Sequence, residues 1–248
     1  MTSNRFLVKQ ENLHLPYARL DGEEHHHLSR VLRVRAGEQV WLMDEKGSSF
    51  RAKITEVGRH ETRLLVLERE ERAAAKIRLV LGQALIKSRN MDLIIQKATE
   101  LGVQAVVPVE ASRSVPGLKE RSEGKIERWR KIARESAKQS RRTDLPSIHP
   151  PQSLSVFLES REESNKYILC EDGGVLFRQI LAEAAAGPAF PGMPEVVLLV
   201  GPEGGWSREE EQRAREHGFI AISLGARILR SETAALAALA AIQVFWGG

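Results

Sequence analysis

Two segments near the carboxyl end of the chain place glycines and charged residues where apolar strands are expected to end. The first, LLVGPEGG, spans residues 198–205 and runs into a helix that Ser207 can cap. Consecutive glycines at its end let the backbone approach a ligand closely, while three glutamates in the first helical turn disfavour a phosphate. The pattern indicates a site for an adenosine or amino-acid group, with an ordinary strand-to-helix turn as the alternative.

The second segment, LGARILRSETA, spans residues 224–234 and joins the end of a strand to the start of the last helix. Ser231 is expected to cap that helix and Glu232 to lie in its first turn. Arg230 then stands just outside the helix, where it is not part of the buried helix face. An arginine held there is expected to point into a site.

Basic residues gather in one stretch of the chain. The whole molecule carries a formal net charge of +4, whereas residues 113–142 contain eleven basic and four acidic residues, a net of +7. A helix from Gly124 to Arg142 with Ile126 and Trp129 on its apolar face would project its basic side chains outward, as a phosphate backbone requires. The alternative is a solvated helix face balanced by glutamates. The outward residues are Lys125, Arg128, Lys131, Arg134, Lys138 and Arg141, and a second basic run holds Arg30, Arg33 and Arg35.

Other kinds of chemistry find little support. The adjacent histidines His25 to His27 would point about 100° apart on a helix and cannot converge on one ion, so we expect a helix surface or RNA-facing patch and no metal. The single cysteine, Cys170, ends an apolar strand without an activating neighbour and is expected to be a small buried hydrophobe. No two glycines are separated by a single residue and no glycine loop ends in Gly-Lys-Ser or Gly-Lys-Thr, which disfavours dinucleotide and P-loop sites.

The elements that would position these residues fall into two parts with different patterns. From Arg5 to about Arg72, short apolar runs between glycines predict a small β-barrel, interrupted by a helix from Asp21 to Leu32 that Asp21 can cap. Residues 68–76 are expected to be a linker or the segment in which the chain leaves the last strand of this part. Beyond them apolar strands alternate with helical stretches, which predicts a parallel α/β domain.

The period of the apolar residues places the elements of this second part. Strands are predicted at 77–84, 105–109, 167–170, 196–200 and 220–224, and helices at 91–102, 124–142, 175–186 and 207–217, with a last helix from Glu232. The alanine-rich face of that last helix is expected to pack in the core or at a dimer contact.

Length and composition limit the class of protein. The chain has 248 residues, of which 42% are hydrophobic and 28% charged, so a globular protein is expected and not a disordered or fibrous one. One cysteine excludes an internal disulfide and suits a reducing compartment. No signal peptide can be drawn, and the longest apolar run, Ala234–Trp246, is too short for a membrane span. We therefore expect a cytoplasmic protein.

The two C-terminal segments, at this separation, resemble the SPOUT superfamily of knotted RNA methyltransferases. The match is closest to the family of ribosomal RNA small subunit methyltransferase E. Three further stretches extend the resemblance over nearly the whole chain: HHLSRVLRVRAGE at 26–38, MDLIIQKATELGV at 91–103 and RWRKIARESAKQSRR at 128–142.

The resemblance implies a PUA-like β-barrel for RNA at residues 1–73 and a SPOUT domain with a deep trefoil knot at 74–248, in a homodimer. The implied reaction is transfer of a methyl group from S-adenosylmethionine to N3 of a uridine in 16S, small-subunit ribosomal RNA. The positions implied around the cofactor are Glu171, Leu199, Gly201, Glu203, Gly205, Leu224, Gly225 and Leu229. We assign RNA binding to Arg30, Arg33, Arg113, Arg134, Lys138, Arg141 and Arg142.

The chemistry of this reaction suggests catalytic roles for two residues. Loss of the N3 proton leaves negative charge on the flanking uridine carbonyl oxygens, which a fixed cation such as Arg230 would stabilise. Glu232 or a water is the candidate proton acceptor, with a plain first-turn helix residue as the alternative for Glu232.

Three other functions stay open at this point. A non-enzymatic RNA-binding or ribosome-assembly protein would keep the barrel and basic helix but bind no methyl donor. A SPOUT enzyme with another RNA target would bind the donor and modify a different nucleotide. A small-molecule methyltransferase is disfavoured by the +7 segment.

Overall fold

The chain folds into two compact units in a computed structural model that describes residues 4–44, 48–70, 77–115, 122–140, 142, 144–163, 165–186 and 195–247. The first unit comprises Met1–Ala73 with Ala137–Leu145, and the second Ala74–Ser136 with Pro146–Gly248. Each unit has a hydrophobic core of its own. Most of the expected linker, residues 71–76, lies outside the described residues.

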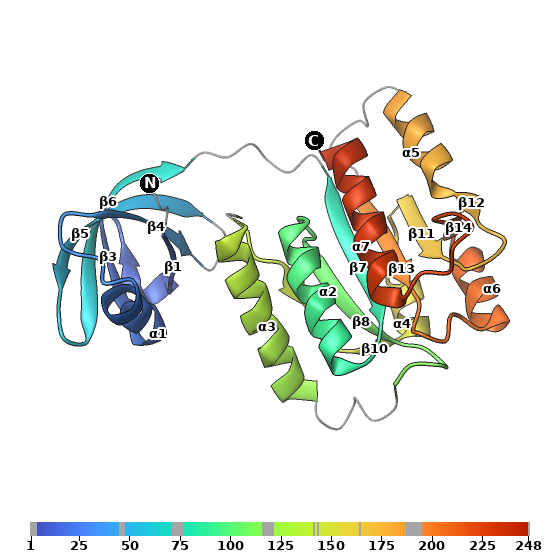
Figure 1. Cartoon of the computed structure of the whole chain (residues 1–248), viewed down its shortest axis with the longest axis horizontal. Helices are drawn as coiled ribbons and strands as arrows, with labels where there is room; N and C mark the ends of the chain where they lie inside the picture. The colour runs from blue at the N-terminus through green and yellow to red at the C-terminus, as the bar shows by residue number, and fades with distance from the viewer. Residues whose placement is uncertain are drawn as a thin grey trace. The chain divides into compact units, whose positions relative to one another are not determined.

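A curled six-stranded sheet forms the N-terminal unit (Figure 1). Its strand order is β1-β4-β5-β6-β3-β2, with β1 and β4 parallel and the other neighbours antiparallel. Alternate residues such as Leu20, Leu42 and Ile54 point into one buried core. The predicted barrel is therefore present as a half-barrel. Its strands are β1 Arg5–Val8, β2 Leu13–His14, β3 Tyr17–Asp21, β4 Gln39–Asp44, β5 Ser49–Val57 and β6 Glu61–Glu70.

The predicted helix of this unit is present as α1 (Gly22–His26), followed by a π-helical turn at His27–Val31. Asp21 precedes α1 but its side chain does not cap it, so that prediction is wrong. The Asp21 carboxylate instead accepts a hydrogen bond from Asn12 Nδ2 at 3.0 Å.

The histidine run is divided between surface and core. His26 and His27 are exposed, as expected of a helix surface. His25 is buried, with Nδ1 2.8 Å from the Thr62 hydroxyl. The surface interpretation is therefore wrong for His25, because a hydrogen-bond partner on β6 allows its ring to enter the core.

The C-terminal unit is built on the parallel sheet that the alternating pattern predicted. The strand order is β10-β8-β7-β13-β11-β14-β12, β9 pairs with β8, and every pair is parallel. The strands are β7 Arg78–Ala84, β8 Ala105–Glu110, β9 Ser147–Ile148, β10 Gln152–Ser153, β11 Asn165–Leu169, β12 Val175–Leu176, β13 Glu195–Val200 and β14 Ile220–Ser223. The helices are α2 Ser88–Glu100, α3 Ser122–Gln139, α4 Leu154–Glu159, α5 Phe177–Ala186, α6 Arg208–Glu216 and α7 Ser231–Ile242.

Helices cover both faces of this sheet, because successive side chains of a buried strand point to opposite sides. Leu198 and Val200 pack with residues of α2 and α7, which lie side by side in Figure 1. Val197 and Leu199 pack on the other face, with Phe157 of α4. The apolar pattern did not predict β9, β10, β12 and α4. Each of these has six residues or fewer, which is too short to show a period.

Candidate active site

A cavity of about 490 Å³ lies where the central strands β11, β13 and β14 end. Its volume falls within the range of about 300–1,000 Å³ that is usual for small-molecule sites. Three loops line it: residues 169–172 after β11, residues 200–206 after β13, and residues 223–231 between β14 and α7. The carboxyl edge of a parallel sheet is where ligands bind in open α/β folds.

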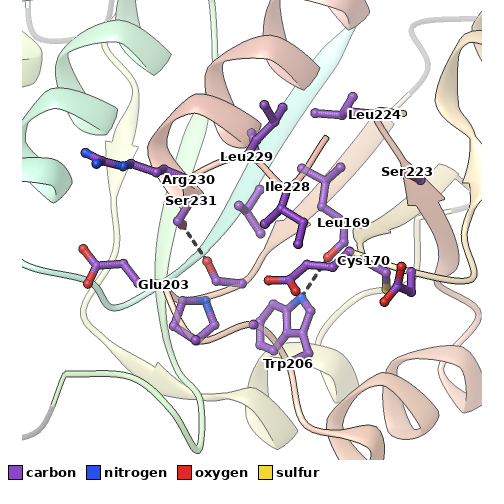
Figure 2. A pocket seen from close by; sticks show the side chains of 18 of the residues that line it. Leu169, Cys170, Glu203, Trp206, Ser223, Leu224, Ile228, Leu229, Arg230 and Ser231 are labelled. Atoms are coloured by element: carbon purple, nitrogen blue, oxygen red, sulfur yellow. Dashed lines mark hydrogen bonds between the residues drawn. The ribbon is translucent and has the colours of Figure 1, made fainter. Parts of the chain in front are cut away.

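Trp206 forms one wall of the cavity and is tied to two of these loops. Its indole nitrogen donates a hydrogen bond to the Leu169 carbonyl at 3.1 Å (Figure 2). The same ring lies against Gly201, where a Cβ atom would come within 3.0 Å of the indole nitrogen. Gly205 completes the turn at a φ of +69°, in the left-handed region that favours glycine. The glycines of this loop therefore meet specific backbone and packing requirements.

The first turn of α6 directly follows the glycine loop, residues 201–206, and fixes its carboxyl end. As predicted, the Ser207 side chain caps α6, accepting from the Glu210 backbone N–H, and the Glu210 carboxylate accepts from the Ser207 N–H at 2.9 Å. The Glu210 carboxylate also accepts from the backbone N–H of Ser112 at 2.7 Å. Beside it, Arg113 Nη1 donates to the Gly204 carbonyl at 2.8 Å. Arg113, assigned to RNA from sequence, thus lies at the cavity and braces the glycine loop.

The second segment supplies the opposite wall. Gly225 adopts a φ of +119°, which side-chain-bearing residues rarely adopt. Arg230 and Glu203 extend on the same side of the cavity, away from Trp206 (Figure 2). Glu203 is held by Lys87 Nζ at 3.5 Å and by Asn90 Nδ2 at 3.2 Å. Among the described residues, no carboxylate pairs with the exposed Arg230 guanidinium.

Ser231 does not have its predicted role. The N-cap of α7 is Arg230, and Ser231 is the first helical residue. The Ser231 hydroxyl instead donates to the Gly201 carbonyl at 2.6 Å and accepts from Gln83 Nε2 at 3.0 Å. It therefore joins the two cavity segments that the sequence singled out.

Most positions expected around the cofactor line this cavity, and two site residues do not. Leu199 is fully buried on the α4 face of the sheet, because it alternates with Leu198 and Val200 along β13. Glu232 lies outside the cavity lining, and its Oε2 atom is buried with no hydrogen-bond partner among the described residues. The residues that the sequence assigned to the cofactor or to catalysis and that do line the cavity are Glu171, Gly201, Glu203, Gly205, Leu224, Gly225, Leu229 and Arg230.

The basic helix α3 ends at Gln139, three residues earlier than predicted. Arg142, which the sequence assigned to RNA binding, is buried and forms an ion pair with Asp144. Lys138 forms an ion pair with Glu24. Arg141 lies outside the described residues.

The remaining basic residues assigned to RNA lie nearer the surface. Arg134 is partly exposed and pairs with Glu127 on the same helix. Arg30 and Arg33 are exposed, and Arg33 has a φ of +54°. Together they present positive charge on two separate elements.

Cys170 lines the cavity as the predicted buried thiol. Burial raises its pKa to about 12, and the nearby Glu211 carboxylate acts in the same direction. At neutral pH the group is therefore protonated and unreactive, since the thiolate is the nucleophile.

We expect the folded protein to react with iodoacetamide at pH 8 at least about 100-fold more slowly than the unfolded chain, because a pKa of about 12 leaves little thiolate. The rate is measured by mass spectrometry with and without guanidinium, and a single cysteine makes the reading unambiguous. The raised pKa of Cys170 also makes the free energy of unfolding depend on pH. The contribution of the protonated thiol is fully present below the pKa of the unfolded chain, and it declines as pH rises from about 9 towards 12. Equal rates in the folded and unfolded states would contradict the burial of this thiol.

No group of three histidine, cysteine or acidic side chains in the described part of the chain could hold a metal ion. None of the helices described is long and apolar enough to cross a bilayer.

Two family models assign a chain with this cavity and these two units to the class of RNA methyltransferases. The family model described as an RNA methyltransferase domain matches residues 73–243, and the RNA methyltransferase PUA domain matches residues 20–67. Because the chain is 33% identical over 95% of its length to a relative of that name, it belongs to the ribosomal RNA small subunit methyltransferase E family.

Relatives and solved structures support this membership. The family member from Bacillus subtilis is 33% identical over 95% of this chain and 93% of its own length. The structure of the Neisseria gonorrhoeae family member, bound to S-adenosylmethionine, is 33% identical, covers 99% of this chain and 98% of its own, and has a TM-score of 0.85. A methyltransferase from Legionella pneumophila in complex with the same cofactor is 31% identical over 98% of both chains, with a TM-score of 0.85.

Proposed function

We propose that this protein transfers a methyl group from S-adenosylmethionine to N3 of a uridine in small-subunit ribosomal RNA. The observation that carries the proposal is the cavity at the ends of β11, β13 and β14, where a glycine loop faces a segment bearing Arg230, which pairs with no carboxylate of the described residues. Both features serve methyl transfer to uridine N3: the first holds the donor, and the second stabilises the negative charge that develops on the base.

The cavity residues fit the proposed donor. Its sulfonium supplies an electrophilic methyl group when bound. The backbone at Gly201, Gly205 and Gly225 can approach a ligand closely, because no side chain intervenes. Carboxylates of Glu171 and Glu203 complement the positive charges of the donor, and Leu224 and Leu229 offer apolar contacts.

Arg230 is the residue we propose for catalysis. As the N3 proton leaves, negative charge spreads to the flanking uridine carbonyl oxygens, and a guanidinium already in place stabilises it without reorganisation. The backbone hydrogen bond from the Ala234 N–H to the Arg230 carbonyl, at 2.8 Å, anchors this residue at the start of α7. The proton acceptor is Glu232 or a water, and the position of Glu232 outside the cavity lining favours a water.

The rest of the chain would bring the RNA to this cavity. We propose that residues 1–73 form the RNA-binding domain, with Arg30 and Arg33 contacting phosphates, and that residues 74–248 form a knotted methyltransferase domain. A homodimer would let one subunit present RNA to the cavity of the other. Because its substrate is ribosomal RNA, we place the protein in the cytoplasm.

The test begins with calorimetry of S-adenosylmethionine binding. The same preparation is then given small ribosomal subunits from cells that lack the protein, with a labelled methyl donor, and the modified nucleotide is mapped by mass spectrometry. We expect binding and incorporation at N3 of one uridine. A folded protein that binds no donor would instead be an RNA-binding or assembly protein, and label at another nucleotide or another RNA would redirect the substrate assignment.

A further inference from the structure

Strand β7 carries one fully buried amide among apolar side chains. Gln83 is 0% exposed, and the neighbouring Leu81 and Ala84 belong to the hydrophobic cores on the two faces of the sheet. The Gln83 Nε2 group makes two hydrogen bonds, to the Ala84 carbonyl and to the Ser231 hydroxyl, both at 3.0 Å.

The partners of this amide fix the direction of the hydrogen bonds. A carbonyl oxygen only accepts, so the amide nitrogen, not the amide oxygen, must face Ala84. The Ser231 oxygen therefore accepts from Gln83, and its single hydrogen is directed at the Gly201 carbonyl, 2.6 Å away (Figure 2). The chain of donors runs in one direction, from β7 through Ser231 to the glycine loop.

This network connects the two segments that form the proposed site. Gln83 pairs in register with Val200, the last residue of β13, and Gly201 opens the glycine loop immediately after it. Ser231 directly follows Arg230 in sequence. Holding Ser231 against Gly201 therefore sets where Arg230 stands relative to the loop.

Stability alone gives a poor explanation for this glutamine. The Gln83 Oε1 atom is buried and accepts no hydrogen bond from the described residues. An unpaired buried acceptor destabilises a fold, whereas an apolar side chain of similar shape would not. The Gln83 amide therefore lowers the stability of the core, and its hydrogen bond to Ser231 gives a functional reason for its presence there.

We infer that Gln83 is a positioning residue, which acts through Ser231 to hold Arg230 in register with the glycine loop. The inference rests on the proposed methyl-transfer function. It adds to that function a residue on a strand outside both cavity segments and outside the cavity lining itself.

The test compares Gln83→Met, Ser231→Ala and the double variant. We expect each single variant to lower the rate of methyl transfer at saturating donor about tenfold, because displacement of a catalytic group slows the chemical step. The double variant should be no slower than the slower single variant, since both changes break one network. The thermal midpoint of Gln83→Met should equal or exceed that of the wild type, which a purely structural role would not produce.

Two further variants serve as controls. Ser231→Thr keeps the hydroxyl and should recover most of the rate lost in Ser231→Ala. Thr99→Val removes another fully buried hydroxyl of this unit, which donates to the Ile95 carbonyl at 2.7 Å. It should lower stability but leave the rate of the folded protein unchanged.

Hydrogen exchange provides a readout that does not depend on activity. In Gln83→Met, the amides of Gly201, of residues 203–206 and of the first turn of α7 should exchange faster than in the wild type. Wild-type exchange together with a wild-type rate would overturn the positioning role. A wild-type protein that is inactive on ribosomal subunits would count against the proposed function, and exchange at 201–206 would then decide the positioning role by itself.

Discussion

Replacing Arg230 by alanine is expected to lower the rate of methyl transfer by about 100- to 1,000-fold, the loss typical when one preorganised group that stabilises a developing anion is removed. The donor affinity should change little, because the Arg230 side chain extends away from the Trp206 wall of the cavity (Figure 2). Single-turnover assays on small ribosomal subunits and calorimetry of donor binding measure the two quantities separately.

Two further variants show whether the loss is specific to this guanidinium. Arg230→Lys keeps the positive charge but not the planar fork, and we expect an intermediate rate. Arg213→Ala removes an exposed arginine of α6 that does not line the cavity, and it should retain the wild-type rate. A wild-type rate in Arg230→Ala would assign the charge stabilisation to another group.

Strand periodicity predicted most of the C-terminal unit because each central strand is buried on both faces. Runs such as Leu79–Leu81 and Val196–Val200 are apolar without interruption, which is the pattern of a covered parallel sheet. The same lack of alternation concealed which side chain faces which layer. The family resemblance placed Leu199 at the cofactor, and the apolar pattern gave no sign that this side chain packs under α4.

The site was predictable where chemistry depends on the backbone, and less so where it depends on long-range contacts. Glycine-rich turns after strands are visible in sequence, and Gly201, Gly205 and Gly225 do line the cavity. Neither Trp206 nor Gln83 was found. For Gln83 a signal existed, since it is the only polar side chain among the buried positions Leu79–Ala84 of β7.

The basic segment shows the limit of counting charge along a sequence. Helical periodicity extends a helix to Arg142, but α3 ends at Gln139 and the chain turns there. Arg142 consequently enters the protein and pairs with Asp144. Local net charge therefore overestimates the positive surface, because partners distant in sequence, such as Glu24 for Lys138, neutralise part of it.

The backbone of the second cavity segment gives a prediction that separates binding from folding. At Gly225, a φ of +119° strains any residue with a side chain, although a Cβ atom there would meet nothing within 4 Å. Such strain costs about 1–3 kcal/mol, and the segment of Gly225→Ala can release it by moving away from its cavity-lining position. We expect the affinity for S-adenosylmethionine to fall by about 5- to 150-fold, measured by calorimetry.

Gly37 offers a matched control in the N-terminal unit. Its φ is +94°, and a Cβ atom there would also meet nothing within 4 Å. Gly37→Ala should therefore lose a comparable amount of thermal stability and bind the donor like the wild type. The contrary outcome is a Gly225→Ala variant with lowered stability and wild-type donor affinity. In that case the segment keeps its conformation under strain, and the backbone at residue 225 does not control donor binding. Comparison of the two variants thus isolates the contribution of one backbone conformation to the site, since neither substitution adds a steric clash.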